Sequence, residues 1–320
     1  MRRIAAAVTA RFLAAGLFAV LSTRTPPARA AASPAAPPIV AAPRIVAAEN
    51  VYGDVASQLA GAGAQVSSVL SNPNQDPHLF EASPSVARAL SRATITISNG
   101  AGYDAWMSGL LAASPAAGRH DIVVGDLLGV RPGSNPHLWY DPQTMVVFAG
   151  GLTEVLDACE PARAAAHAAA RDRFLASLAP VTRRIAEIRR RFGGTSVTAT
   201  EPVFGLMSNA LGLVMRNERF QVAVMNDAEP STSDVVAFED DLRSHRVAVL
   251  FYNSQAIDNA ARRLLGLART AGIPVVGVTE TEPAGLTYQS WMLRELDLAE
   301  KALAAAGSGK RPSKEPSIKP

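Results

Sequence analysis

Cysteine is almost absent from this sequence: the 320 residues include only Cys159. A disulfide framework and a cysteine-rich zinc site are therefore excluded. Histidine is also scarce, so any imidazole metal site must draw on a short set: His78, His120, His137, His167 and His245. The His-Glu-x-x-His and Gly-x-Ser-x-Gly motifs are missing, which removes the usual signatures of zinc proteases and α/β-hydrolases.

The remaining composition is that of an ordinary folded protein. Apolar residues make up 48% and charged residues 18% of the chain. These values exclude a disordered, collagen-like or coiled-coil protein. The length suits one large domain or two of medium size.

The first thirty residues have the pattern of a secretory signal. Arg2 and Arg3 precede an apolar stretch from Ile4 to Leu21, and Ala28-Arg29-Ala30 offers a small-x-small cleavage site. A membrane anchor is the alternative, but Arg11 interrupts the stretch and no stop-transfer charge follows it. We expect cleavage near Ala30, a linker over residues 31–42 and a periplasmic product.

Removal of this segment reverses the sign of the net charge. Residues 1–30 carry five arginines and no acidic residue, so the formal charge changes from +3 to −2. A nucleic-acid partner therefore loses its main electrostatic support. Basic charge recurs in the Gly/Ser/Pro/Lys-rich tail, 307–320, but such a stretch is typical of a disordered end.

The first half of the mature chain alternates between short β-branched runs and amphipathic stretches. The pattern predicts four strands: Ile45–Ala48, Gln65–Leu70, Thr94–Ser98 and Ile122–Val124. It predicts helices after them over Val51–Ala60, Pro84–Leu90, Tyr103–Ala112 and a longer stretch that begins at Pro142.

The second half repeats this alternation. It predicts strands over Ser196–Thr200, Val222–Met225, Val247–Phe251 and Pro274–Val278. Helices are expected over Val203–Leu211, Asp234–Arg243, Ala256–Ala271 and Tyr288–Ala305. Alternating strands and helices favour an α/β fold with two lobes, each a four-stranded and mainly parallel sheet flanked by helices.

Between the two sets lies Glu160–Arg191, which is rich in Ala and Arg and lacks a strand pattern. It predicts one long connecting helix over residues 160–192, with a possible bend at Pro180. The lobes on either side then span residues 43–159 and 193–306. A single stiff connector limits how far two lobes can swing.

Metal-capable side chains recur where predicted strands end. His78 follows the second strand, His137 the fourth, Glu201 the fifth, and Glu280 with Glu282 the eighth. Ligands of open α/β sheets bind beyond the carboxyl ends of the strands. Two neutral imidazoles and two carboxylates would neutralise a divalent cation, and this donor set suits Mn²⁺, Zn²⁺ or Fe²⁺.

The loops that carry these residues resemble one family closely. The markers are Asp76-Pro77-His78-Leu79-Phe80-Glu81, Ser98-Asn99-Gly100, Asn135-Pro136-His137-Leu138-Trp139-Tyr140-Asp141-Pro142, Thr198-Ala199-Thr200-Glu201 and Thr279-Glu280. From about Pro43 to Ala306 the chain resembles the metal-binding extracytoplasmic solute-binding proteins of zinc/manganese ABC importers. The resemblance implies two lobes, a long joining helix, and metal held by His78, His137, Glu201 and Glu280. It also implies a monomer without enzymatic activity that delivers Mn or Zn to the membrane subunits of an ABC permease.

The chain departs from the family pattern at two ligand positions. The third ligand is Glu201, as in manganese-type members, and the fourth is Glu280 where Asp is usual, with Glu282 as a close rival. The loop Val130–Ser134 is short and lacks the histidines of many zinc members. These features favour manganese without excluding zinc, which binds such ligands more tightly when geometry imposes no control. Asp141, Asn99 or Asp76 could orient a ligand imidazole, although Asp76 and Asp141 each precede a proline and could equally form turns.

Two other functions remain open from the sequence. Gly100-Ala101-Gly102-Tyr103-Asp104-Ala105 follows a strand and matches a dinucleotide loop, although it lies in the third strand–helix unit rather than the first. An exported zinc hydrolase could use three of the four ligands, with Glu282 as its general base.

Overall fold

The computed structural model describes residues 42–73, 77 and 80–307 of the chain. The expected signal segment, most of the linker, the tail after residue 307, and Asp76 and His78 lie outside the described residues. The described residues belong to one compact unit of the chain. No helix in these ranges is long and apolar enough to cross a membrane.

The first sheet contains four parallel strands in the order β2-β1-β3-β4. Their bounds are Arg44–Glu49 for β1, Gln65–Leu70 for β2, Ile95–Ser98 for β3 and His120–Val123 for β4. In the central pairing, Ile45 lies opposite Ile95 and Ala47 opposite Ile97, and all four side chains are buried. These buried β-branched runs are the signal that predicted the strands, and the prediction is confirmed.

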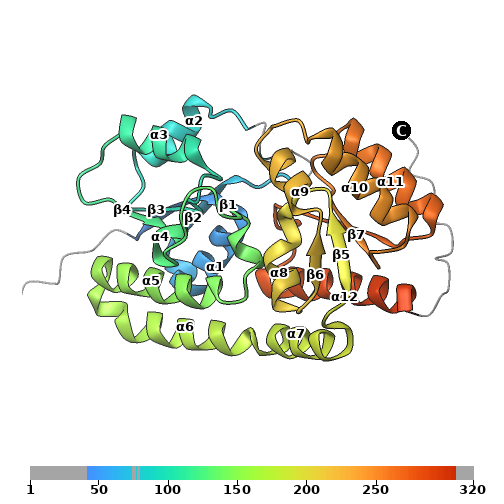
Figure 1. Cartoon of the computed structure of the whole chain (residues 1–320). Helices are drawn as coiled ribbons and strands as arrows, with labels where there is room; N and C mark the ends of the chain where they lie inside the picture. Colours follow the sequence, from blue (N-terminus) through green and yellow to red (C-terminus); the bar gives the residue numbers. More distant parts are fainter. Residues whose placement is uncertain (1–41, 74–76, 78–79, 308–320) are drawn as a thin grey trace, which may run out of the picture. The chain divides into compact units, whose positions relative to one another are not determined.

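The second sheet repeats this arrangement in the order β6-β5-β7-β8, again with all pairs parallel. The strands are β5 (Ser196–Ala199), β6 (Val214–Arg216), β7 (Leu250–Asn253) and β8 (Val275–Val278). The fold is therefore α/β with two four-stranded parallel sheets, as expected, and Figure 1 shows the two sheets with their helices.

One of the predicted strands was wrong. Val222–Met225 is not a strand but the end of helix α9 (Glu218–Met225), and the sixth strand is the three-residue β6. The two valines of this run suggested a strand, yet Val222 is exposed while Phe220 is buried against Phe238 of the next helix. Packing of one helical face therefore overrode the β-branched composition.

Helices cover both sheets. Those of the first half are α1 (Asn50–Ala60), α2 (Pro84–Leu90), α3 (Ala105–Ala113), α4 (Val124–Leu127) and α5 (Thr144–Cys159). Those of the second half, besides α9, are α8 (Gly205–Ala210), α10 (Thr232–Arg243), α11 (Asn259–Ala271) and α12 (Tyr288–Gly307). Local capping explains two of the starts, because Ser231 accepts the backbone N–H of Asp234 and Asp258 accepts that of Ala261.

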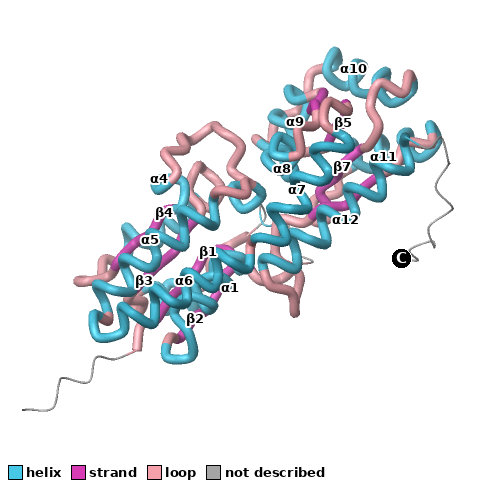
Figure 2. Tube along the Cα trace, turned by 90° about the horizontal axis from the view of Figure 1, so that it is seen from below, coloured by secondary structure: helices cyan, strands magenta, loops and turns pink. Residues whose placement is uncertain are grey.

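The connector is two helices rather than the single helix that was expected. Helix α6 spans Ala164–Ser177, α7 spans Ala179–Phe192, and Leu178 separates them. Pro180 lies in the first turn of α7, where its missing N–H costs no helical hydrogen bond. Helix α6 packs against α1 and α5 of the first half, and α7 packs against α12 of the second (Figure 2).

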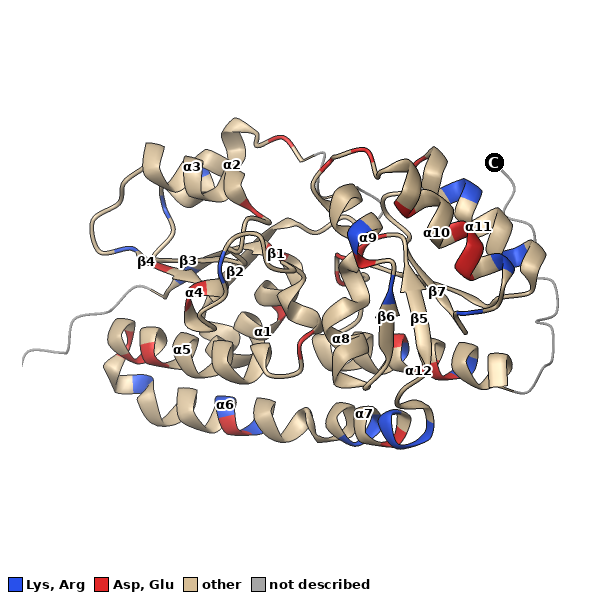
Figure 3. Ribbon diagram, in the orientation of Figure 1, with Lys and Arg blue, Asp and Glu red and all other residues tan. Residues whose placement is uncertain are grey.

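Charge reinforces the contact between α7 and α12. Figure 3 shows the basic residues gathered on α7, with acidic residues on α12. Arg184 pairs with Asp297 at 2.7 Å and also with Glu300, which in turn pairs with Arg191. The connector is thereby tied to the last helix of the second half.

An aromatic cluster joins the two halves near the centre of the molecule. Tyr140 lies between Phe204 and Trp291, with ring centroids 5.3 and 5.6 Å away, and its hydroxyl donates to the carbonyl of Thr279. Tyr288 donates to the carbonyl of Trp139. One continuous hydrophobic core therefore includes residues of both sheets, and the loops at the strand ends rest on it.

Candidate metal centre

The predicted ligands that the structure describes lie in buried loops beyond the strand ends. His137 stands just before the short 3₁₀ turn Leu138–Tyr140, Glu201 follows β5, and Glu280 follows β8. All three side chains are buried. Among the described residues, no three His, Cys, Asp or Glu side chains are grouped so as to hold a metal ion. The structure does bring His137 and Glu280 together, and it links Glu201 to Glu280 through one shared residue.

His137 is held in a single tautomer. Its Nδ1 lies 2.8 Å from Oδ1 of Asn135, whose own amide N–H donates to the carbonyl of Pro202 at 2.7 Å. Because this second bond fixes the orientation of the Asn135 amide, Oδ1 must accept and Nδ1 must carry the proton. In the neutral imidazole the lone pair then stands on Nε2, as a metal ligand requires.

The Nε2 atom of His137 faces the carboxylate of Glu280. It is buried and finds no hydrogen-bond partner among the described residues, yet it lies 3.3 Å from Oε2 of Glu280. When the imidazole is neutral and the carboxyl is ionised, neither atom has a proton to donate to the other. Two buried acceptors in this position face each other unfavourably, and a cation bound between them would make the contact favourable.

Glu201 and Glu280 are joined by an asparagine that sequence reasoning missed. Asn253, at the end of β7, donates from Nδ2 to Oε2 of Glu201 at 3.1 Å and to Oε1 of Glu280. The signal that could have found Asn253 is its polar side chain at the end of a strand.

The loop of Glu280 is fixed by two further residues. Gln255 accepts the backbone N–H of Glu280 at 2.6 Å and that of Thr281 at 3.0 Å. Tyr103, from the first half of the chain, donates its hydroxyl to Oε2 of Glu280 at 2.8 Å. Burial, followed by the nearby Glu280 and Glu49, raises the pKa of Tyr103 well above its ordinary value, so the phenol keeps its proton.

Glu282 occupies a different environment from Glu280. Its backbone N–H and C=O both bond the amide of Asn50, at 3.0 and 2.7 Å. Burial and then the nearby Asp54 raise the pKa of Glu282 to about 9. Burial therefore favours the neutral form of the Glu282 carboxyl when no cation is bound, whereas the Glu280 carboxylate accepts hydrogen bonds from Tyr103 and Asn253.

Two of the suggested orienting residues, Asn99 and Asp141, have other roles, and the third, Asp76, lies outside the described residues. Asn99 accepts the hydroxyl of Tyr52 and donates to the carbonyl of Pro136, so it holds the backbone before His137 rather than the imidazole. Asp141 accepts the backbone N–H of Gln143, as a turn residue does. Asn135, two residues before His137, is the imidazole partner that was overlooked.

The glycine-rich loop after β3 is not arranged for a dinucleotide. The carboxylate of Asp104 accepts the backbone N–H groups of Asn99 at 2.6 Å and Gly100 at 2.9 Å. These are the first N–H groups that a phosphate would use at this position, and an anion already occupies them.

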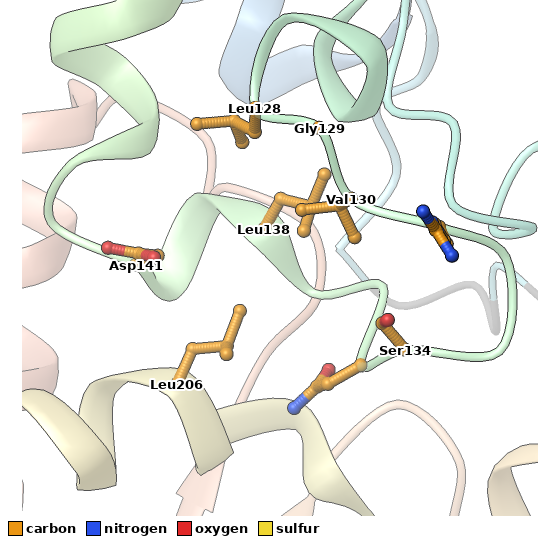
Figure 4. A pocket seen from close by; sticks show the side chains of 9 residues that line it. Leu128, Gly129, Val130, Ser134, Leu138, Asp141 and Leu206 are labelled. Atoms are coloured by element: carbon orange, nitrogen blue, oxygen red, sulfur yellow. The ribbon is translucent and has the colours of Figure 1, made fainter.

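A cavity of about 470 Å³ is lined in part by Asn135. Figure 4 shows Leu128 and Val130 from the loop after α4 and Leu206 from α8 around it, with Asp141 at its margin. His137, Glu201 and Glu280 do not line this cavity. The candidate ligands, which are buried, therefore lie outside the lining of this cavity.

Comparison with known proteins identifies the family of the chain. Residues 45–302 match the family model of ZnuA, the periplasmic component A of zinc-uptake complexes, and the chain therefore belongs to this family of solute-binding proteins of ABC importers. A curated relative from Thermotoga maritima, provisionally named a metal-binding protein, is 26% identical over 214 residues, which are 66% of this chain and 75% of the relative.

Solved structures share the fold. The periplasmic zinc-binding protein TroA from Treponema pallidum is 17% identical and superposes with a TM-score of 0.68 over 82% of this chain and 99% of TroA. The solute-binding protein FpvC from Pseudomonas aeruginosa, solved with Mn²⁺, is also 17% identical, with a TM-score of 0.70 over 83% of this chain and 100% of FpvC. The expected family and two-lobed fold are confirmed.

Proposed function

We propose that this protein is an exported receptor that captures a divalent transition metal, Mn²⁺ or Zn²⁺, and delivers it to the membrane subunits of an ABC permease. In this proposal the signal is cleaved near Ala30, and the mature protein works in the periplasm as a monomer and not as an enzyme. Membership of the zinc-uptake family supports the class of cargo and the class of partner.

The ligands that we propose are His78, His137, Glu201 and Glu280. One observation carries the proposal: Nε2 of His137 lies 3.3 Å from Oε2 of Glu280 in a buried place, while Nδ1 of the same ring faces the oxygen of Asn135. With the imidazole neutral, a divalent cation between these two atoms would be bound by both of them. His78 lies outside the described residues and enters the set by its motif alone.

The lobes would span residues 43–159 and 193–306, with residues 160–192 as the connector. Hydrogen bonds join the two halves beside the proposed ligands, from Tyr103 to Glu280 and from Asn135 to Pro202. Because the halves also share one aromatic core, we expect metal capture to move loops more than lobes. The permease would then have to weaken the site to release the cation.

The test is the metal content of protein purified from the periplasm without added metal, followed by competition between Mn²⁺ and Zn²⁺ monitored by calorimetry. We expect one bound cation per chain and mutual displacement of the two metals at one site. Failure of both metals to bind would contradict the proposal.

A further inference from the structure

Asn253 is the residue that fixes the two candidate carboxylates. It lies at the carboxyl end of β7, and its side chain is buried. Its Oδ1 accepts the backbone N–H of Gln255 at 3.0 Å, so its NH₂ group must point the other way, toward the carboxylates. The two amide hydrogens are then shared out, one to Glu201 and one to Glu280.

This arrangement distinguishes the two oxygens of each carboxylate. Asn253 binds Oε2 of Glu201 and Oε1 of Glu280. In Glu280 the other oxygen, Oε2, is the one that lies 3.3 Å from His137 Nε2. The amide therefore holds Glu280 so that a single oxygen is presented toward the imidazole.

The number of carboxylate oxygens matters for the choice of metal. Zn²⁺ is satisfied by four nitrogen, sulfur or oxygen donors in a tetrahedral arrangement. Oxygen-preferring cations such as Mn²⁺ favour higher coordination, which a glutamate can supply by chelating through both oxygens. A glutamate that chelates through both oxygens must weaken or lose the hydrogen bond from Asn253.

We propose that Asn253 determines metal specificity: its two N–H groups keep Glu201 and Glu280 monodentate, and so favour a four-coordinate cation such as Zn²⁺ over Mn²⁺. Asn253 acts through the ligands and does not itself touch the cation. The inference rests on the proposed function, because it needs Glu201 and Glu280 to be ligands.

The experiment measures the ratio of the Mn²⁺ and Zn²⁺ dissociation constants by competition titration. The Asn253→Ala variant is compared with the native protein and with Asn209→Ala, which removes an exposed amide from α8 in the same half. We expect Asn253→Ala to lower the ratio Kd(Mn)/Kd(Zn) at least tenfold, and Asn209→Ala to leave it within twofold. If a folded Asn253→Ala protein still binds both metals and its ratio is unchanged or higher, the role of Asn253 in specificity is overturned. The proposed function would stand in that case.

A second measurement does not depend on the variant. In a crystal structure of the native protein loaded with Mn²⁺, we expect one oxygen from each glutamate on the cation and both hydrogen bonds of Asn253 retained. A glutamate that chelates through both oxygens overturns the inference. If the native protein binds neither metal, the proposed function fails as well, so the two failures are distinguishable.

Discussion

Each half of the molecule uses an asparagine to orient a candidate ligand, but the two asparagines present opposite ends of the amide. In the first half, Asn135 presents its carbonyl oxygen to a neutral imidazole and fixes the tautomer of His137. In the second half, Asn253 presents its NH₂ group to two carboxylates and fixes their rotation. Each amide is oriented by a further bond to the backbone, to Pro202 O and from Gln255 N respectively. The charge of the ligand decides which end of the amide faces it.

The largest loss of metal affinity is expected on substitution of His137, the candidate ligand that the first half supplies among the described residues. His137→Ala should weaken metal binding at least 100-fold, about 2.7 kcal/mol, because it removes one coordinate bond and leaves Glu280 without a nitrogen donor beside it. Calorimetric titration measures the loss. Among the described residues, the one hydrogen bond of the imidazole is that to Asn135, 2.8 Å away, so we expect circular dichroism to show a retained fold. Unaltered affinity would remove His137 from the ligand set.

In the second half, two neighbouring glutamates provide a matched pair. Glu280→Gln should weaken metal binding about 10- to 100-fold because it removes a negative charge from the cation. Glu282→Gln should change the affinity less than threefold, since the Glu282 carboxyl is already neutral at pH 7 according to its pKa of about 9. Titration of both variants at pH 7 checks the order. The reverse order would mean that Glu282 is the ligand.

A smaller effect is expected for the residue behind the imidazole. Asn135→Ala should weaken metal binding about tenfold, because the proton on Nδ1 of His137 loses its acceptor. Asn135→Asp retains an acceptor at the same position and should recover most of the affinity. The same titrations measure both variants. If Asn135→Asp were as weak as Asn135→Ala, the bond from the Asn135 amide to Pro202 would be the important one.

The smallest effect concerns a buried carboxyl of the last helix, Glu295. Burial raises the pKa of Glu295 in α12 to about 7, against an ordinary value near 4.5, although Trp291 donates to it at 3.1 Å. The folded state therefore binds the proton more tightly, and this contribution to stability is complete below pH 4.5 and is lost as the pH rises through 7. Glu295→Gln keeps the acceptor for Trp291 and removes the titration.

We therefore expect Glu295→Gln to melt at the same temperature as the native protein near pH 4.5, and roughly 3–6 °C higher near pH 8. Thermal unfolding followed by circular dichroism at the two pH values measures the difference. An equal difference at both pH values would show that the carboxyl does not titrate between them.

Much of this fold could be predicted because buried parallel strands have a simple sequence pattern. Ile95-Thr96-Ile97 and Val275-Val276 are bounded, β-branched runs, and both lie in strands. β6 could not be recognised, since Val214-Met215-Arg216 is short and owes its strand geometry to pairing with β5. The valines of Val222–Met225 gave a stronger local signal but lie in a helix, because burial of Phe220 decides the local structure there.

The candidate site was predictable only in part. Glu201 and Glu280 follow strands closely, His137 lies in the loop after the fourth strand and α4, and all three belong to types that bind metals, so they could be chosen from the sequence. Asn135 and Asn253 could not be assigned in this way, because an asparagine after a strand has many uses, and its role depends on which neighbours the folded chain supplies. Asn253 meets Glu201 and Glu280 across separations of 52 and 27 residues.

The most direct test of the account is a crystal structure of the native protein with Zn²⁺, with the cation located by its anomalous scattering. The account predicts one cation about 2.0–2.2 Å from His137 Nε2 and from one oxygen each of Glu201 and Glu280, with His78 as the fourth ligand. A cation bound elsewhere, or one bound with His137 Nε2 turned away from it, would contradict the account.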